Sequence, residues 1–202
     1  MKPDAERVLA GILSDRVRQA AKGRVDVITV GVDLTGDDRP EHVELVALYE
    51  VATQAVSWTG KSYPTSEQEN SLIHVADLET HFLRVAGERV VVLGCHDLNM
   101  FNPRGWANQD PGGVRHLRCA DMRMRTLAFR PTVILQHPHS TDTPNIWRNA
   151  WGEIASELPD VTAWASGIAY HRWGDEPRAA IERVLTDTQG GEPCVDFLVD
   201  AN

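Results

Sequence analysis

The chain has 202 residues, 42% of them hydrophobic, and a formal net charge of -9, values that are typical of an acidic globular protein. This charge disfavours bulk binding to nucleic acid or to an anionic membrane, because the long-range field repels phosphate. No apolar run approaches the roughly 20 residues of a membrane span, and the first residues lack signal-peptide features. Three cysteines cannot form a closed disulfide set. We therefore expect a soluble, cytoplasmic single domain over residues 1–202.

The first part of the chain predicts an N-terminal helix and an antiparallel hairpin. Hydrophobic periodicity gives, in order, a helix over 4–22, a strand over 25–34, a turn over 35–40, a strand over 43–51 with an extension through 55–58, and a helix over 66–86. The turn is too short for a crossover connection, so its two strands should be antiparallel.

The second part alternates strands and helices. The expected elements are a strand over 90–93, a loop over 98–113, a helix over 114–129, a strand over 132–135, a helix over 144–158, a strand over 161–170, a helix over 175–187 and a strand over 194–199. Continuous apolar runs such as 90–93 are typical of parallel strands that are buried on both faces. We predict an α/β fold, a mostly parallel sheet with helices on both faces in a Rossmann-like three-layer arrangement.

Histidines gather where these strands end. His96 and Asp97 follow the strand over 90–93, His137 and His139 follow the next strand, and His171 follows a third. Ligands of open α/β sheets bind at the carboxyl ends of the strands. We therefore expect these side chains to share one site.

Imidazole and carboxylate groups together suit a divalent metal such as zinc, manganese or iron. His96, Asp97, His137 and His139 are the predicted metal ligands and catalytic residues, because a bound metal would generate hydroxide at neutral pH. Two plainer interpretations stay open: the histidines are hydrogen-bonded structural residues, or they hold a ligand without a metal.

Cys95 offers another interpretation, as a nucleophile with a histidine base. A nucleophile at the end of a strand usually passes straight into a helix, which orients it. Here Pro103 and Gly105 predict a long loop instead, so the sequence favours Cys95 as a small buried apolar residue.

The loop over 98–113 is long enough to be a lid or a binding loop. Arg104 and Asn99 are its predicted ligand-binding residues, since a guanidinium group binds anions well. Asp142 stands just before a predicted helix N-terminus that favours anions, and with His171 it completes the predicted ligand site.

These patterns lead to the hypothesis of a metal-assisted hydrolase of a small anionic substrate, a phosphoester or a nucleotide. The alternative is a non-catalytic, Rossmann-like sensor of a nucleotide or metabolite, in which the same histidines hydrogen-bond the ligand. A third possibility is an interaction subunit whose partner surface covers 98–130.

Overall fold

The computed structural model of the protein describes residues 2–35, 42–65, 68, 72–107, 109–137 and 144–166. Within these residues, no helix is both long and apolar enough to cross a membrane. The elements in chain order are α1 (Lys2–Ile12), α2 (Asp15–Ala21), β1 (Val27–Thr35), β2 (His42–Glu50), β3 (Val56–Gly60), the 3-10 helix η1 (Leu78–His81), β4 (Phe82–Val85), β5 (Glu88–Gly94), the 3-10 helix η2 (Asp97–Phe101), α3 (Pro103–Ala107), α4 (Val114–Phe129), β6 (Val133–His137), α5 (Pro144–Glu157) and β7 (Ala163–Ser166).

The strands of the described residues form two separate sheets. The first is antiparallel, in the order β1-β2-β3, and the second has the order β4-β5-β6-β7. In the second sheet β4 is antiparallel to β5, whereas β5, β6 and β7 run parallel. The chain is thus a mixed α/β protein with one mostly parallel sheet and one antiparallel sheet.

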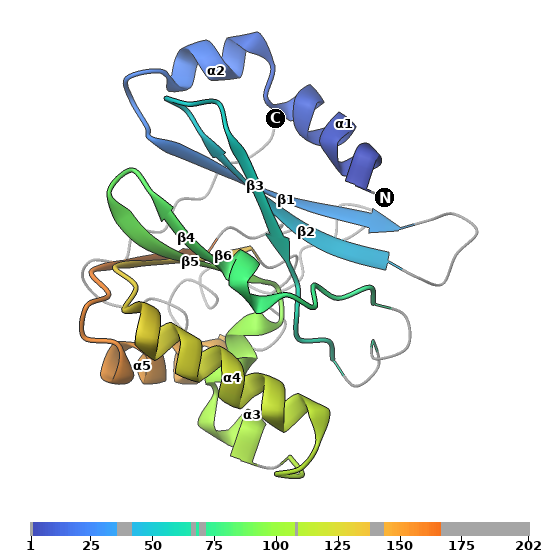
Figure 1. Cartoon of the computed structure of the whole chain (residues 1–202), viewed down its shortest axis with the longest axis vertical. Helices are drawn as coiled ribbons and strands as arrows, with labels where there is room; N and C mark the ends of the chain where they lie inside the picture. The colour runs from blue at the N-terminus through green and yellow to red at the C-terminus, as the bar shows by residue number, and fades with distance from the viewer. Residues whose placement is uncertain are drawn as a thin grey trace.

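Three apolar clusters hold the layers together, and they follow the alternation of side chains along each strand. Leu9 and Leu13 of the N-terminal segment pack on Ala47 and Tyr49 of β2. The other face of β2 presents Val46 to Val92 of β5, so the two sheets pack face to face. The opposite face of the second sheet packs on η2, α4 and α5. The layers are therefore helix, sheet, sheet and helix, as Figure 1 shows from top to bottom.

This order differs from the predicted three-layer arrangement. The mostly parallel sheet is confirmed, but helices cover only one of its faces among the described residues. Its other face is covered by the antiparallel sheet, because β2 and β5 both carry apolar side chains at alternate positions toward each other. The Rossmann-like architecture is not confirmed.

Three local predictions differ from the structure. The helix expected over 66–86 is absent from the described part of that range, where η1 leads into β4 instead. Ala86 and Gly87 both have positive φ, 52° and 83°, and they form the two-residue turn of the β4–β5 hairpin. The loop expected over 98–113 contains η2 and α3, so the chain coils into helical turns soon after β5. The N-terminal helix is also divided, at Leu13 and Ser14.

Candidate functional site

A buried ion pair stands where β2 and β3 meet. The register pairs Leu45 with Gly60, and the backbone N–H of Lys61 donates to the carbonyl of Glu44 at 2.8 Å, so Glu44 and Lys61 are direct cross-strand neighbours. Their side chains form an ion pair with 2.9 Å between Nζ and Oε1. Cross-strand neighbours of opposite charge stabilise one another, and burial strengthens the attraction.

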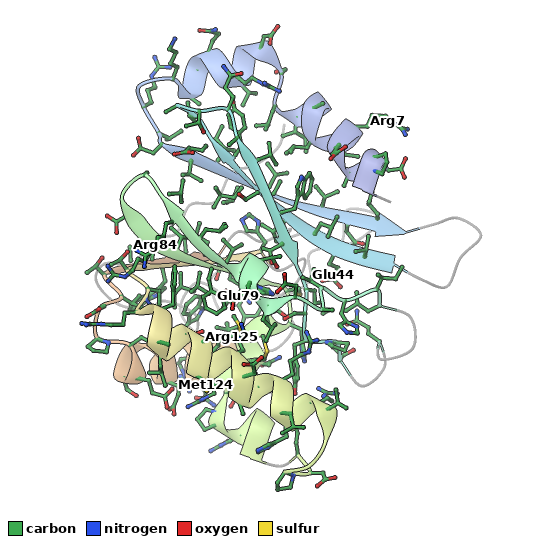
Figure 2. The ribbon with its side chains drawn as sticks, in the orientation of Figure 1. Arg7, Glu44, Glu79, Arg84, Met124 and Arg125 are labelled. Atoms are coloured by element: carbon green, nitrogen blue, oxygen red, sulfur yellow. The ribbon has the colours of Figure 1, made fainter. Side chains whose placement is uncertain are left out.

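The ion pair is almost completely enclosed. Lys61 is 1% exposed and Glu44 is 8% exposed. Glu44 lies on the same face of β2 as Val46, which packs toward the second sheet, and Figure 2 shows it in the interior, unlike Arg7 at the periphery. Lys61 also donates to Gln68 Oε1 at 2.6 Å. Since desolvating an ammonium and a carboxylate is costly, a fully buried pair of this kind calls for a functional explanation.

The second sheet approaches Lys61 of this ion pair at Gly94, the residue before Cys95. Gly94 ends β5 so close to Lys61 that a Cβ on it would lie 2.7 Å from both the N and the Cα of Lys61. Only glycine allows this approach of the two backbones. Cys95 is the next residue, and one residue step is about 3.8 Å. Cys95 is a partly buried free cysteine, and its carbonyl accepts a hydrogen bond from Gln136 Nε2 at 3.0 Å, which fixes the backbone there.

Asp97 fixes the turn that carries Cys95. Its carboxylate, which is fully buried, accepts from the backbone N–H of Ser62 at 2.9 Å, Tyr63 at 2.8 Å and Gly94 at 2.8 Å. It is also the first residue of η2, so the strand passes into a helical turn after His96. One carboxylate therefore binds the segment after Lys61 to the turn around Cys95.

His96 lies between this turn and Tyr63. Its ring stacks on Tyr63 with 5.6 Å between centroids and 7° between planes, and Asn99 Nδ2 lies 2.9 Å from its Nδ1. Burial lowers the pKa of His96 to about 4, with smaller contributions from the positive charges of Lys61 and Arg115. His96 is therefore neutral at pH 7.

His137 ends the neighbouring strand and faces the first sheet. The register pairs it with Gly94, and a Cβ on Gly31 of β1 would lie 3.4 Å from its Nδ1. Burial lowers the pKa of His137 to about 4 as well. Because β5 and β6 are adjacent, the residues at their carboxyl ends lie at one edge of the second sheet. This register agrees with the expectation for His96, Asp97 and His137.

The other predicted site residues have different positions. Asn99 lies in η2 beside His96, and its Oδ1 is buried without a hydrogen-bond partner in the described structure. Arg104 is exposed on α3. His139, Asp142 and His171 lie outside the described residues. The anion-binding roles of Asn99 and Arg104 stay predictions.

Sequence reasoning missed Glu44 and Lys61. Glu44 shares a strand face with Val46 and Leu48, both of which are buried against the second sheet. A charged residue on the buried face of a strand is unusual, and this could have identified Glu44 as a candidate site residue. Lys61 follows Gly60, where a Cβ would lie 2.3 Å from the carbonyl of Glu44. A glycine inside a strand pattern indicates such a close approach.

No protein-family model and no curated protein matches the chain. It is similar to solved structures of amidases. One is the NitN amidase from Nesterenkonia sp. AN1, with 16% identity and a TM-score of 0.40 over 75% of this chain and 52% of that one. Another is a mutant of the amidase from Nesterenkonia sp. AN1 whose active-site cysteine has added acrylamide, with 14% identity and a TM-score of 0.41 over 76% and 54%. The chain thus spans about half the length of these amidases.

The prediction of a metal-assisted hydrolase of phosphoesters or nucleotides is wrong. Asp97, one of its four ligands, accepts hydrogen bonds from three backbone amides, which leaves its carboxylate committed to the fold. His96 stacks on Tyr63, and His137 packs against β1. Metal-binding is not supported, since the described residues contain no group of three His, Cys, Asp or Glu side chains placed to hold an ion; a divalent cofactor stays an untested prediction.

Proposed function

We propose that the protein is a cysteine-dependent hydrolase of carbon–nitrogen bonds in amides, with Cys95 as the nucleophile and Glu44 and Lys61 as its partners. The observation that carries the proposal is the buried Glu44–Lys61 ion pair, because the backbone of Lys61 lies against Gly94, the residue before Cys95. The expected catalytic roles of His96 and His137 are thereby replaced by positioning roles.

The chemistry takes two steps. In the first, Cys95 Sγ attacks the amide carbonyl carbon and its proton passes through Glu44 to the leaving nitrogen, so that a thioester forms and ammonia or an amine departs. In the second, Glu44 takes a proton from water, the hydroxide attacks the thioester, and the carboxylic acid and the free thiol result. Both steps pass through a tetrahedral oxyanion.

Lys61 is suited to stabilise this oxyanion. Its ammonium group has three donors, and in the described structure two of them go to Glu44 and Gln68. The third is available for the developing negative charge. In a site from which water is excluded, such a preorganised donor contributes more than it would in water. The nitrogen of an amide leaves only after it has gained a proton. In this mechanism the carboxyl group of Glu44 supplies that proton.

The test is ammonia release from a panel of short aliphatic amides, combined with intact-mass detection of the acyl-enzyme. We expect Cys95→Ala to abolish both signals. Cys119→Ala is the matched control, because Cys119 is a fully buried core cysteine of α4. Ammonia release that survives in Cys95→Ala would refute the proposal, as would a wild-type protein that releases no ammonia from any amide of the panel.

A further inference from the structure

The outer face of α4 is apolar along the whole helix. The structure describes every residue of α4, and those that are exposed are all apolar: Val114, Leu117, Ala120, Met124, Leu127 and Ala128. We call this set the outer stripe, and its large side chains are between 50% and 81% exposed. The opposite face of α4 packs into the core through Cys119 and Met122. A surface helix usually turns charged side chains toward water, so a second apolar face indicates a second packing partner.

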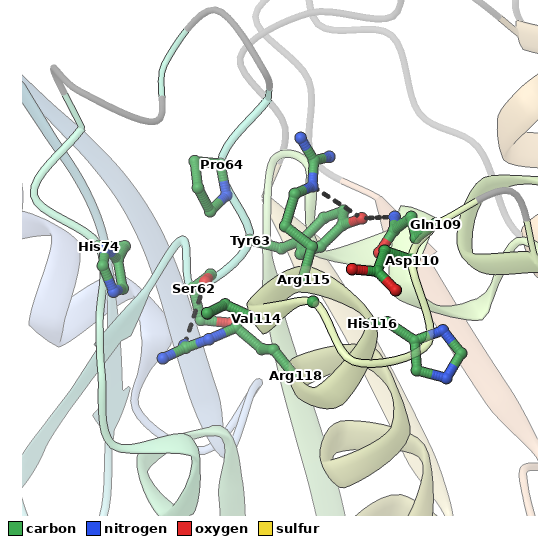
Figure 3. A pocket seen from close by; sticks show the side chains of 11 residues that line it. Ser62, Tyr63, Pro64, His74, Gln109, Asp110, Val114, Arg115, His116 and Arg118 are labelled. Atoms are coloured by element: carbon green, nitrogen blue, oxygen red, sulfur yellow. Dashed lines mark hydrogen bonds between the residues drawn. The ribbon is translucent and has the colours of Figure 1, made fainter.

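The charged side chains of α4 instead contact the rest of the chain. Arg115 donates to the Tyr63 hydroxyl at 3.3 Å, and Arg118 donates to the carbonyl of Ser62 at 3.1 Å, as Figure 3 shows for the start of the helix. The two other arginines of α4 form ion pairs with carboxylates of α5 and η1. These contacts hold α4 on its own sheet and leave the outer stripe facing away from it.

The large residues of the outer stripe are placed symmetrically about the middle of α4, next to Ala120. Leu117 and Met124 stand at equal distances along the helix from this middle, and so do Val114 and Leu127. Two antiparallel copies of α4 related by a two-fold axis therefore bring Leu117 of one copy against Met124 of the other. Val114 of one copy lies against Leu127 of the other in the same way. A two-fold interface needs a surface that is complementary to itself in this sense.

The centre of the outer stripe allows two helices to approach each other closely. Ala120 has a small side chain, and packed helices need axes about 8–10 Å apart. Asp121 stands next to it, and its carboxylate is paired with Arg125 of the same helix at 2.8 Å. A second copy would therefore meet no unpaired charge from Asp121 at the middle of the contact.

We propose that the protein forms a homodimer through the outer stripe, with the α4 helices of the two copies packed antiparallel. The inference is independent of the proposed amide hydrolysis. A membrane surface suits this stripe less well, because the net charge of -9 is repelled by anionic lipid. A helix of 16 residues is about 24 Å long, so its contact with one other helix is small beside the roughly 1,200–2,000 Å² of a stable interface. We therefore expect a weak dimer, with a Kd of about 1–100 μM.

Self-association is tested by sedimentation equilibrium of the full chain from about 1 to 200 μM. Wild type should pass from monomer to dimer in this range. Leu117→Glu should raise the Kd by about tenfold or more, because the two-fold axis places the new charge in the interface twice. Val8→Glu is the matched control, since Val8 is also an apolar helix residue, 43% exposed, but belongs to α1. This control should dimerise like wild type, and circular dichroism should show that both variants are folded.

A mixture of two variants tests the antiparallel packing. Met124→Lys should also weaken the dimer when it is alone. Mixed in equal amounts with Leu117→Glu, it sets the introduced ammonium against the introduced carboxylate across the interface, so the mixture should associate more tightly than either variant. A mixture that associates no more than its components would overturn the antiparallel packing. A wild type that stays monomeric, or a Leu117→Glu variant that dimerises like wild type, would overturn the homodimer in favour of another occupant of the stripe.

Discussion

Two buried carboxylates lie at this edge of the sheets, and their partners differ in kind. Asp97 is fully buried and accepts hydrogen bonds from three backbone amides. Glu44 is 8% exposed and pairs with the ammonium of Lys61. The negative charge of Asp97 is stabilised by the dipoles of the backbone. The negative charge of Glu44 is stabilised by the positive charge of Lys61, and neither of these two charges would be stable in the interior without the other.

The difference separates a structural role from a chemical one. Backbone amides do not give up their protons, so their three hydrogen bonds let Asp97 hold the turn without a proton transfer. Lys61 carries exchangeable protons beside the Glu44 carboxylate, which can accept one, and the backbone of Lys61 lies against the residue before Cys95. Variants of the two carboxylates and of their partners should therefore have different consequences for stability and for activity.

The largest effect is expected for Lys61→Met. This variant leaves the carboxylate of Glu44 buried without its cation, and breaking one side of a buried ion pair costs about 3–5 kcal/mol. Unfolding in urea measures the loss. The double variant Glu44→Gln/Lys61→Met, which removes both charges, should regain most of the stability and none of the amide hydrolysis. Hydrolysis that returns with stability would show that the ion pair is structural, like Asp97.

Asp97→Asn should have the next largest effect. The amide keeps one acceptor oxygen but turns an NH₂ group toward a backbone donor, so at least one buried N–H loses its partner, at a cost of about 1–3 kcal/mol. The free energy of unfolding measures this cost. We expect kcat to fall as well, because the segment after Lys61 is no longer fixed to the turn of Cys95. Asp121→Asn on the surface of α4 is the control. Unchanged stability in Asp97→Asn would contradict the structural role.

The smallest effect concerns the two histidines beside these carboxylates. The pKa of His137 is lowered from 6.5 to about 4 by burial, so between these values the unfolded chain binds a proton that the folded protein does not. Stability is therefore complete above about pH 6.5 and falls as the pH decreases toward 4. One histidine contributes at most about 1.4 kcal/mol per pH unit, and less here because the side chain is partly exposed.

The check is urea unfolding of wild type and His137→Gln at several pH values from 4.5 to 7. As the pH falls, the free energy of unfolding should decrease less in the variant than in the wild type. Protonation of His96 in the unfolded chain should account for part of the decrease that the variant still shows. Identical slopes in the two proteins would mean that His137 is not protected from protonation by the fold.

The sequence predicts the strands of the fold better than their layering. Apolar runs such as that of β5 mark buried strands, but they do not say whether a helix or another sheet covers them. The hairpin after η1 was missed because Ala86 adopts positive φ at 52°, a conformation that alanine rarely takes. Gly87, at 83°, was the signal available for this turn.

The position of the candidate site was predicted more closely than its chemistry. The strand ends at Gly94 and His137 are neighbours in the structure, as the rule for parallel sheets implies. The histidines received the main role because they follow the predicted strands of the parallel sheet, whereas Glu44 lies inside an antiparallel strand. The pairing of Glu44 with Lys61 depends on the register of β2 and β3, and their approach to Cys95 depends on the packing of two sheets. Neither can be inferred from local spacing.

The missing side chain of Gly94 has a consequence for how the protein becomes active during folding. Glu44 and Lys61 meet as soon as the β2–β3 hairpin forms, since their contact is local in sequence. Cys95 reaches them only after the second sheet has closed onto the first with no Cβ between the two backbones. Contacts between distant segments form late because they need long loops to close. We therefore expect refolding followed by circular dichroism to precede the return of amide hydrolysis, so that activity reports the moment at which the two sheets close.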